Sequence, residues 1–227
     1  MSGIAQRIAD IRSTLPAGTE LVAVSKFHPA ESIAEAYDAG QRVFGESRVQ
    51  ELIAKRQALS GRDGIRWHFI GHLQTNKVRA LVGQADLIES IDSERLLDAV
   101  DRESLRDGTI SRVFLQVHVA AEETKFGFSP DELLGFFTRR DFERLKAVHI
   151  CGLMGMATNT DDWTRVADDF RLVAALRDRI LTIAPDLRGF DTLSMGMSDD
   201  YPLAIAAGST MVRVGTAIFG QRDYHKP

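Results

Sequence analysis

Short apolar runs alternate with helical patterns from one end of the chain to the other. Short runs of β-branched and other apolar residues are typical of strands buried on both faces of a parallel sheet. The sequence predicts eight strands, over Leu21–Lys26, Val43–Glu46, Trp67–Gly71, Leu87–Ile91, Val113–Val119, Ala147–Met154, Thr192–Met195 and Met211–Val214. Between them, apolar residues recur every three or four positions, as in Ile33, Ala36 and Tyr37, which predicts amphipathic helices.

Several of the predicted helices have recognisable ends. Ser129 followed by Pro130 supplies an N-cap and a first-position proline, and Ser93 is a second predicted N-cap. The apolar stripe that begins at Val166 predicts a long helix that runs to about Ile183. These signals place helices between the strands without relying on periodicity alone.

The alternation of strands and helices predicts a parallel sheet joined by right-handed crossovers. Eight such units in 227 residues fit an α/β fold of the (β/α)8 TIM-barrel type, with an extra N-terminal helix whose Ile4, Ile8 and Ile11 share one face. The alternative is an open, doubly wound sheet. Its nucleotide-binding version is weakened because no G-x-G-x-x-G loop follows the first strand and no P-loop is present. No stretch rich in Pro, Gly or Ser interrupts the pattern, so we expect one domain over residues 1–227.

Composition narrows the class of protein further. An apolar fraction of 44% and a charged fraction of 26% are those of an ordinary soluble globular protein. The net charge of −4 argues against a dedicated nucleic-acid binder, and no apolar stretch is long enough to span a membrane. The single cysteine, Cys151, excludes an intramolecular disulfide, and its apolar neighbours predict a small core residue. We therefore expect a cytoplasmic protein.

Lys26 stands at the carboxyl end of the first predicted strand, directly before Phe27, His28 and Pro29. Pro29 suits the first turn of a following helix, so an ammonium group is expected where a buried strand meets a loop. Burial lowers the pKa of a lysine, and a neutral amine is the nucleophile that forms a Schiff base with an aldehyde. In the alternative interpretation, the side chain of Lys26 simply reaches solvent at the end of its strand.

The segments after the last two predicted strands have the composition of an anion site. Ser194, Gly196, Gly215 and Thr216 combine hydroxyl donors with glycines that allow backbone N–H groups to approach a ligand. In barrels the site lies at the carboxyl ends of the strands, and the loops after strands seven and eight often bind phosphate. We predict a phosphate site here; the alternative is that both segments are only tight turns.

Arg213 lies inside the apolar run of the last strand, and its side chain is expected on the same side as Gly215. A charge among apolar neighbours must be paired or must meet a ligand. We favour contact with a ligand. The alternative is an internal salt bridge with a partner on strand two or strand six.

The remaining polar residues at strand ends carry weaker signals. His68 and His72 have a spacing that suits metal binding on a helix, but they fall in and after a predicted strand, so we expect no metal site. Asp199 and Asp200 are expected to begin a helix, where carboxylates are stabilised by the positive end, rather than to act in acid–base catalysis.

Taken in order, these segments resemble the pyridoxal-phosphate homeostasis protein family, whose single-domain barrel is similar to the N-terminal domain of alanine racemase. The resemblance covers nearly the whole chain, and its last two motifs are long and specific. The motifs are Ala23-Val24-Ser25-Lys26, Phe44-Gly45-Glu46, Trp67-His68-Phe69-Ile70-Gly71, Gly71-His72-Leu73-Gln74-Thr75-Asn76-Lys77, Thr124-Lys125-Phe126-Gly127, Gly152-Leu153-Met154, Leu193-Ser194-Met195-Gly196-Met197-Ser198-Asp199-Asp200 and Gly208-Ser209-Thr210-Met211-Val212-Arg213-Val214-Gly215-Thr216-Ala217-Ile218-Phe219-Gly220.

The resemblance implies roles for particular residues. Lys26 would hold pyridoxal 5′-phosphate as a Schiff base, an internal aldimine. Ser194, Gly215 and Thr216 would lie at the phosphate, and Arg213 would face the pyridine nitrogen.

The resemblance also implies a carrier without catalytic activity, which keeps the free aldehyde low and passes the cofactor to enzymes that depend on it. Pyridoxal-phosphate-dependent apoenzymes are therefore the implied partners. The chain departs from the family at Ser47, where the family usually has Asn after Phe-Gly-Glu. A contact made by an amide at that position is in doubt, because a serine cannot span the same distance.

A pyridoxal-phosphate-dependent amino-acid racemase is the competing function. A two-base racemase needs an acid or base on each face of its substrate. The chain continues for only eleven residues after Thr216, so we expect no second domain to supply the opposing base. The three tyrosines, Tyr37, Tyr201 and Tyr224, fall in predicted helices or in the tail.

A third interpretation keeps the lysine and the phosphate site but drops the cofactor. It is a Schiff-base aldolase that acts on a sugar phosphate, with Glu46 or His68 as the proton shuttle. The specific motifs argue against it, and only the cofactor interpretation predicts a yellow protein.

Overall fold

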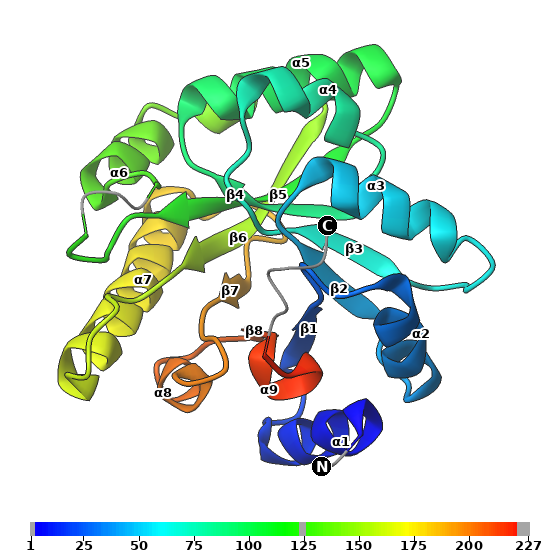
Figure 1. The fold of residues 1–227 in the computed structure, drawn as a ribbon. Helices are drawn as coiled ribbons and strands as arrows, with labels where there is room; N and C mark the ends of the chain where they lie inside the picture. The colour runs from blue at the N-terminus through cyan, green and yellow to red at the C-terminus, as the bar shows by residue number, and fades with distance from the viewer. Residues whose placement is uncertain (1–2, 123–125, 222–227) are drawn as a thin grey trace.

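Eight parallel strands close into a barrel in this computed structural model, which describes residues 3–122 and 126–221 (Figure 1). The strands follow one another around the barrel in sequence order, and β8 pairs with β1 to close it. Their bounds are β1 Glu20–Val24, β2 Val43–Glu46, β3 Arg66–Phe69, β4 Leu87–Ile91, β5 Ser111–Val117, β6 Val148–Gly155, β7 Thr192–Ser194 and β8 Met211–Val214. The predicted (β/α)8 barrel is confirmed, and the open-sheet alternative is wrong.

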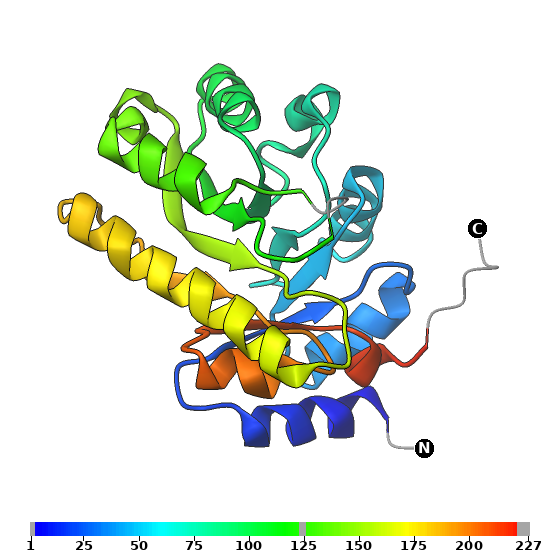
Figure 2. The same cartoon turned by 90° about the vertical axis from the view of Figure 1, so that its left-hand side faces the viewer.

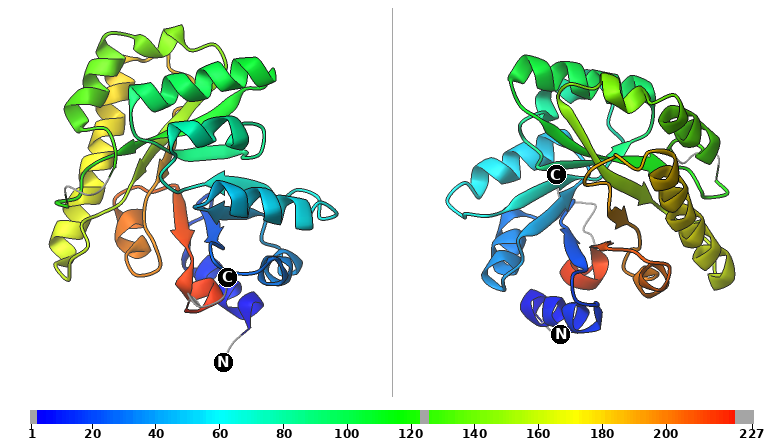
Figure 3. Two further views of the ribbon diagram at one scale, coloured as in Figure 1. Left: turned by 45° about the horizontal axis from the view of Figure 1, so that its top comes forward. Right: turned by 180° about the vertical axis from the view of Figure 1, so that it is seen from behind.

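The helices lie outside the strands in the views of Figure 1, Figure 2 and Figure 3. The long α7 packs against β6 and beside α6 and α8. The α-helices are α1 Ile4–Thr14, α2 Ala30–Asp38, α3 Val49–Ala58, α4 Val78–Leu81, α5 Glu94–Asp107, α6 Pro130–Thr138, α7 Trp163–Ile183, α8 Tyr201–Ala206 and α9 Thr216–Phe219, with short 3-10 turns η1 Thr75–Lys77 and η2 Asp141–Arg144. Among the described residues, none of these helices has the length and apolar character needed to cross a membrane.

Local sequence signals explain where several helices begin. Ser129 forms a capping box with Glu132 at the start of α6, and the Ser93 hydroxyl accepts a hydrogen bond from the Leu96 N–H at the start of α5. Both predicted N-caps are confirmed, and α7 ends at Ile183 as predicted. The extra N-terminal helix is also confirmed, since α1 buries Ile4, Ile8 and Ile11 beside α2 and α9.

Pro29 and the end of β1 differ from the prediction. Pro29 is the N-cap of α2 rather than a residue of its first turn. The strand β1 ends at Val24, because the Ser25 carbonyl accepts a hydrogen bond from the His28 N–H at 3.0 Å and the chain turns there. Lys26 therefore lies in a turn beyond the strand instead of being its last residue.

The inside of the barrel has an apolar layer beneath a polar one. The apolar cluster contains Val22, Val43, Leu87, Phe114, Cys151, Met154 and Met211, so Cys151 is a core residue as predicted. Two positions beyond Leu87 and Met211, Glu89 and Arg213 are also buried, and residues two apart on a strand point the same way. The polar layer consequently lies nearer the carboxyl ends of the strands, where the site is expected.

Candidate functional site

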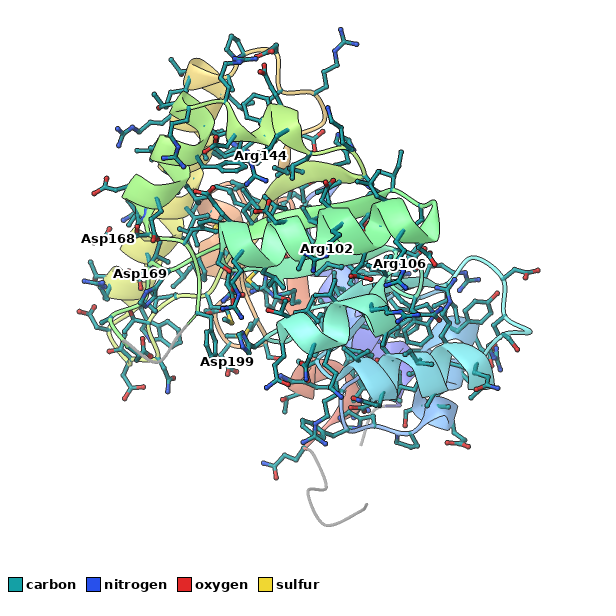
Figure 4. The ribbon with its side chains drawn as sticks, turned by 90° about the horizontal axis from the view of Figure 1, so that it is seen from above. Arg102, Arg106, Arg144, Asp168, Asp169 and Asp199 are labelled. Carbon is teal, nitrogen blue, oxygen red and sulfur yellow. The ribbon has the colours of Figure 1, made fainter. Side chains whose placement is uncertain are left out.

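A cavity of about 240 Å³ opens at the carboxyl ends of β1, β6 and β8. Its polar lining consists of Lys26, Ser198, Asp199, Arg213, Gly215 and Thr216, and its apolar walls of Val24, Ile70, Met154, Met156 and Met197. Asp199 is labelled in Figure 4, where it lies apart from the exposed arginines Arg102 and Arg106 of α5. First and last strands thus contribute to one site, because β1 and β8 are neighbours in the closed barrel.

Lys26 is presented by a tight turn over Ser25, Lys26, Phe27 and His28. Phe27 has a φ of 66°, a left-handed backbone conformation that residues other than Gly and Asn rarely adopt. The ring of His28 stacks on Phe219 of α9, with centroids 5.1 Å apart. The lysine that the sequence singles out therefore sits, half-buried, in a strained turn at the edge of the cavity.

A buried charged cluster supports this turn. The Lys55 Nζ donates hydrogen bonds to the Ser25 carbonyl at 2.7 Å, to Glu46 Oε1 at 2.8 Å and to Glu51 Oε1 at 2.7 Å. The Ser25 hydroxyl donates to Glu46 Oε1 at 2.6 Å, while Glu46 Oε2 is buried and has no partner. Burial raises the pKa of Glu46 to about 7, and the nearby Lys55 and the Ser25 hydroxyl only partly offset it.

A second buried cluster surrounds Arg213. Its guanidinium donates to the carbonyl and the hydroxyl oxygen of Ser194, each at 2.6 Å, and to the Gly155 carbonyl at 3.0 Å. The Ser194 hydroxyl in turn donates to Glu89 Oε2 at 2.6 Å, and His68 Nδ1 lies 2.7 Å from Glu89 Oε1. The cluster joins β3, β4, β6, β7 and β8 across the inside of the barrel.

The two ionised groups of this cluster stabilise each other. Burial acts to raise the pKa of Glu89, but hydrogen bonds and charges from His68, Arg213 and Ser194 outweigh it, so this pKa lies below its usual value. Desolvation lowers the pKa of Arg213, and the carboxylates of Glu89 and Asp200 act in the opposite direction. Arg213 Nη1 lies 3.9 Å from Glu89 Oε2. The salt-bridge partner is thus on β4, not on strand two or six, and Arg213 also lines the cavity.

The predicted anion-site residues fall into two groups. Gly215 and Thr216 line the cavity, with Thr216 exposed. Ser194 and Gly196 do not belong to its lining, and the Ser194 hydroxyl is engaged by Glu89 and Arg213. Gly196 has a φ of 92°, and a Cβ there would lie 2.7 Å from atoms of Tyr201 and Ala204, so it shapes the loop. From the same loop, Ser198 lines the cavity, and its hydroxyl oxygen accepts a hydrogen bond from the Ala217 N–H at 3.4 Å.

The other polar residues from the sequence have structural partners. His72 stacks on Phe126 and lies with its Nδ1 3.1 Å from Asp92 Oδ2. No group of histidine, cysteine and acidic side chains in the described part of the chain could hold a metal ion. Asp200 is the N-cap of α8, as expected, while its neighbour Asp199 lines the cavity. Thr124 and Lys125 of one motif, and Tyr224, lie outside the described residues.

Ser47, the departure from the family, lies beside a close backbone approach. A Cβ on Gly71 would lie only 2.2 Å from the Ser47 carbonyl oxygen, so glycine is required there for the loops after β2 and β3 to pack. Ser47 is not among the residues that line the cavity.

Three residues of the site were missed by sequence reasoning. Glu89 had the same signal as Arg213, a charge inside an apolar strand. Lys55 falls on the apolar stripe of Val49 and Leu52, one turn after Glu51, and so could have been identified as a buried lysine with a carboxylate partner. Ser198 was part of a recognised motif, but no pattern separates its role from that of Ser194.

The residues that line the cavity fit pyridoxal 5′-phosphate. A primary amine at one side matches an aldehyde, and the Ser198 and Thr216 hydroxyls beside Gly215 match a phosphate. A guanidinium at the floor is a donor for a ring nitrogen. When bound, this cofactor supplies an aldehyde that condenses with an amine and an electron-withdrawing ring.

Similarity to known proteins extends over nearly the whole chain. A family model described as the N-terminal domain of alanine racemase matches residues 1–223. The pyridoxal phosphate homeostasis protein of Escherichia coli strain K12 is 38% identical over 238 aligned positions that span both chains completely. The protein of the same name from Haemophilus influenzae is 38% identical over 90% of this chain and 86% of its own length.

Solved structures of related proteins show the same relationship and share the fold. PipY of Synechococcus elongatus without PLP superimposes with a TM-score of 0.91 and 41% identity, over 96% of this chain and 100% of PipY. PipY with PLP bound gives a TM-score of 0.88 and 40% identity over the same shares. Alanine racemase from E. faecalis has a TM-score of 0.71 at 20% identity, over 96% of this chain and 57% of the enzyme, which shows a shared fold alone.

The raised pKa of Glu46 predicts a specific dependence of stability on pH. Its contribution to the free energy of unfolding is fully present below its ordinary pKa of 4.5 and is lost as the pH rises to about 7. The stability of the wild type relative to Glu46→Gln should therefore fall by about 3 kcal/mol between pH 4 and pH 8. Urea unfolding at both pH values measures it. The exposed Glu31→Gln is the control, and a stability difference between the wild type and Glu46→Gln that does not change with pH would contradict the prediction.

Proposed function

The chain belongs to the family of alanine racemase N-terminal domains and, within it, to the pyridoxal phosphate homeostasis proteins, and from this premise we propose that it binds pyridoxal 5′-phosphate and takes part in its intracellular homeostasis. In this proposal the cofactor is held as an aldimine with Lys26 and is handed on to apoenzymes that need it. PipY, a relative of 40% identity, has been solved with PLP bound.

The observation that carries the proposal is the meeting of Lys26 and Arg213 in one cavity. A condensation between the Lys26 amine and the cofactor's aldehyde forms an imine and releases water. Arg213 would face the pyridine nitrogen. A guanidinium held beside Glu89 stays protonated and disfavours a protonated ring, so the ring would be a weaker electron sink than one paired with an aspartate.

We assign the phosphate to the loops after β7 and β8. Gly215 and Thr216 keep the direct role expected from the sequence, and Ser198 joins them because it lines the same cavity. Ser194 and Gly196 receive supporting roles: Ser194 orients Arg213, and Gly196 allows the loop its turn.

Lys26→Ala should abolish covalent capture of pyridoxal phosphate by borohydride, because the variant lacks the amine that condenses with the aldehyde. Peptide mapping after reduction measures the adduct, and circular dichroism checks that the barrel is intact. Lys77→Ala serves as the control and should keep the adduct. An adduct found mainly on Lys77 or Lys125 in the wild type would contradict the assignment.

Thr216→Val should weaken binding of pyridoxal phosphate roughly tenfold or more, since a hydrogen bond to a charged group contributes about 1.5–3 kcal/mol. Binding of pyridoxal, which lacks the phosphate, should change little. Titration of the visible absorbance measures both ligands. Thr182→Val on α7 is the matched control, because Thr182 is exposed and its hydroxyl donates to the Asp178 carbonyl on the same helix. Equal losses for both ligands would place the phosphate elsewhere.

The holo-protein should not racemise amino acids, because we assign no second acid or base to the face of the cofactor opposite Lys26. Incubation with single-enantiomer amino acids in deuterium oxide, followed by mass spectrometry, measures exchange of the α-proton. We expect exchange no faster than with free cofactor, together with transfer of the cofactor to an added apoenzyme. Protein-dependent exchange at about 1 per second or faster, ordinary for enzymes, would establish the racemase alternative.

A further inference from the structure

The turn that carries Lys26 is held in a conformation that its own sequence disfavours. The His28 N–H bonds to the Ser25 carbonyl, so Lys26 and Phe27 occupy the two central positions of the turn. A positive φ at the third residue of a turn normally calls for glycine or asparagine, and here a phenylalanine adopts 66°. Such strain persists only where surrounding contacts enforce it.

Those contacts come from α3 and the loop before it. The Phe27 N–H donates to Glu51 Oε1 at 2.7 Å, and the Arg48 guanidinium lies 4.6 Å from the centroid of the Phe27 ring. On the other side of Lys26, the Ser25 carbonyl accepts a hydrogen bond from Lys55. Both peptide groups that flank Lys26 are thus fixed by side chains of one helix.

Lys55 joins these contacts into one unit. Its three N–H groups match its three acceptors, the Ser25 carbonyl, Glu46 and Glu51, and its side chain is only 8% exposed. Glu51 Oε1 accepts from both Lys55 and Phe27, so the ammonium group also fixes the carboxylate that holds the Phe27 amide. Removing Lys55 would leave two carboxylates close together without a cation and would release both sides of the turn.

We infer that Lys55 is a positioning residue, which locks the Ser25–His28 turn so that the Lys26 amine is aimed at the aldehyde. The inference rests on the proposed function, since it concerns how Lys26 meets the cofactor. Lys55 acts through the backbone of the turn and through Glu51. It has no assigned contact with the cofactor, because it is not among the residues that line the cavity.

This role predicts a selective defect rather than a general one. Pyridoxine 5′-phosphate has a hydroxymethyl group where pyridoxal 5′-phosphate has its aldehyde, so it uses the phosphate and ring contacts but cannot form an imine. The ratio of the two dissociation constants therefore isolates the contribution of Lys26. Damage to the barrel as a whole would weaken both ligands alike.

The experiment measures both dissociation constants and the amide hydrogen exchange of Phe27 and His28 in the ligand-free protein. For Lys55→Met we expect the preference for the aldehyde to fall about tenfold, pyridoxine phosphate binding to stay within about twofold, and exchange at the turn to accelerate. Lys55→Arg, which keeps the charge, should restore part of the preference. Arg56→Met is the matched control: it removes a neighbouring cation of α3 that bonds to the Gln84 carbonyl, and it should leave the preference unchanged.

Glu51→Ala provides a second test if Lys55→Met does not fold, because the Glu51 side chain is 19% exposed and removing it releases the Phe27 amide. It should lower the aldehyde preference in the same direction. An unchanged preference in the variants that fold, or equal weakening of both ligands, would overturn the inference. A wild type that shows neither an aldehyde preference nor an adduct on Lys26 would instead contradict the proposed function, and the inference with it.

Discussion

A guanidinium in the interior of the barrel imposes the main constraint on this structure. Arg213 is only 4% exposed, and an uncompensated charge at that depth would be strongly destabilising. Its compensation comes from Glu89 on β4, Ser194 on β7 and the Gly155 carbonyl on β6. The strands that surround the proposed ring site are therefore tied together by the same group that would face the ring. Stability of the barrel and geometry of the site depend on one set of hydrogen bonds.

In the second cluster, around Lys55, the pKa of the buried carboxylate is shifted in the opposite direction. Glu89 is hydrogen-bonded at both oxygens, and its pKa lies below the usual value. Glu46 has one oxygen without a partner, and burial raises its pKa to about 7. The Arg213 side of the cavity is thus supported by a carboxylate whose pKa is lowered, and the Lys26 side by one whose pKa is raised to about 7. Such pairs of carboxylates with separated pKa values are typical of functional sites.

The sequence was sufficient to predict the barrel and to single out Lys26 and Arg213, which line one cavity. The eight strands, the N-caps Ser93 and Ser129 and the length of α7 follow from local patterns, and β2, β4 and β8 have the predicted bounds. What could not be predicted depends on long-range contacts. Ser194 and Ser198 differ in role because the Ser194 hydroxyl donates to Glu89, which is 105 residues away in sequence, whereas Ser198 lines the cavity. The sequence did not predict that Lys55 is buried, because a lysine on a helix is usually exposed.

The pairing of β1 with β8 determines when the site can form during synthesis of the chain. Val22 stands opposite Arg213 in the register, and a Cβ on Gly215 would lie 3.2 Å from the Val24 carbonyl, so the proposed lysine and phosphate contacts come from the two ends of the chain. Contacts of such large sequence separation form slowly and require nearly the whole chain. A ribosome-bound nascent chain would carry Lys26 from the outset yet offer no cavity to the aldehyde until β8 had emerged. Under the proposed function, capture of the cofactor would therefore wait for completion of synthesis, and a chain truncated before β8 would have Lys26 but no specific site.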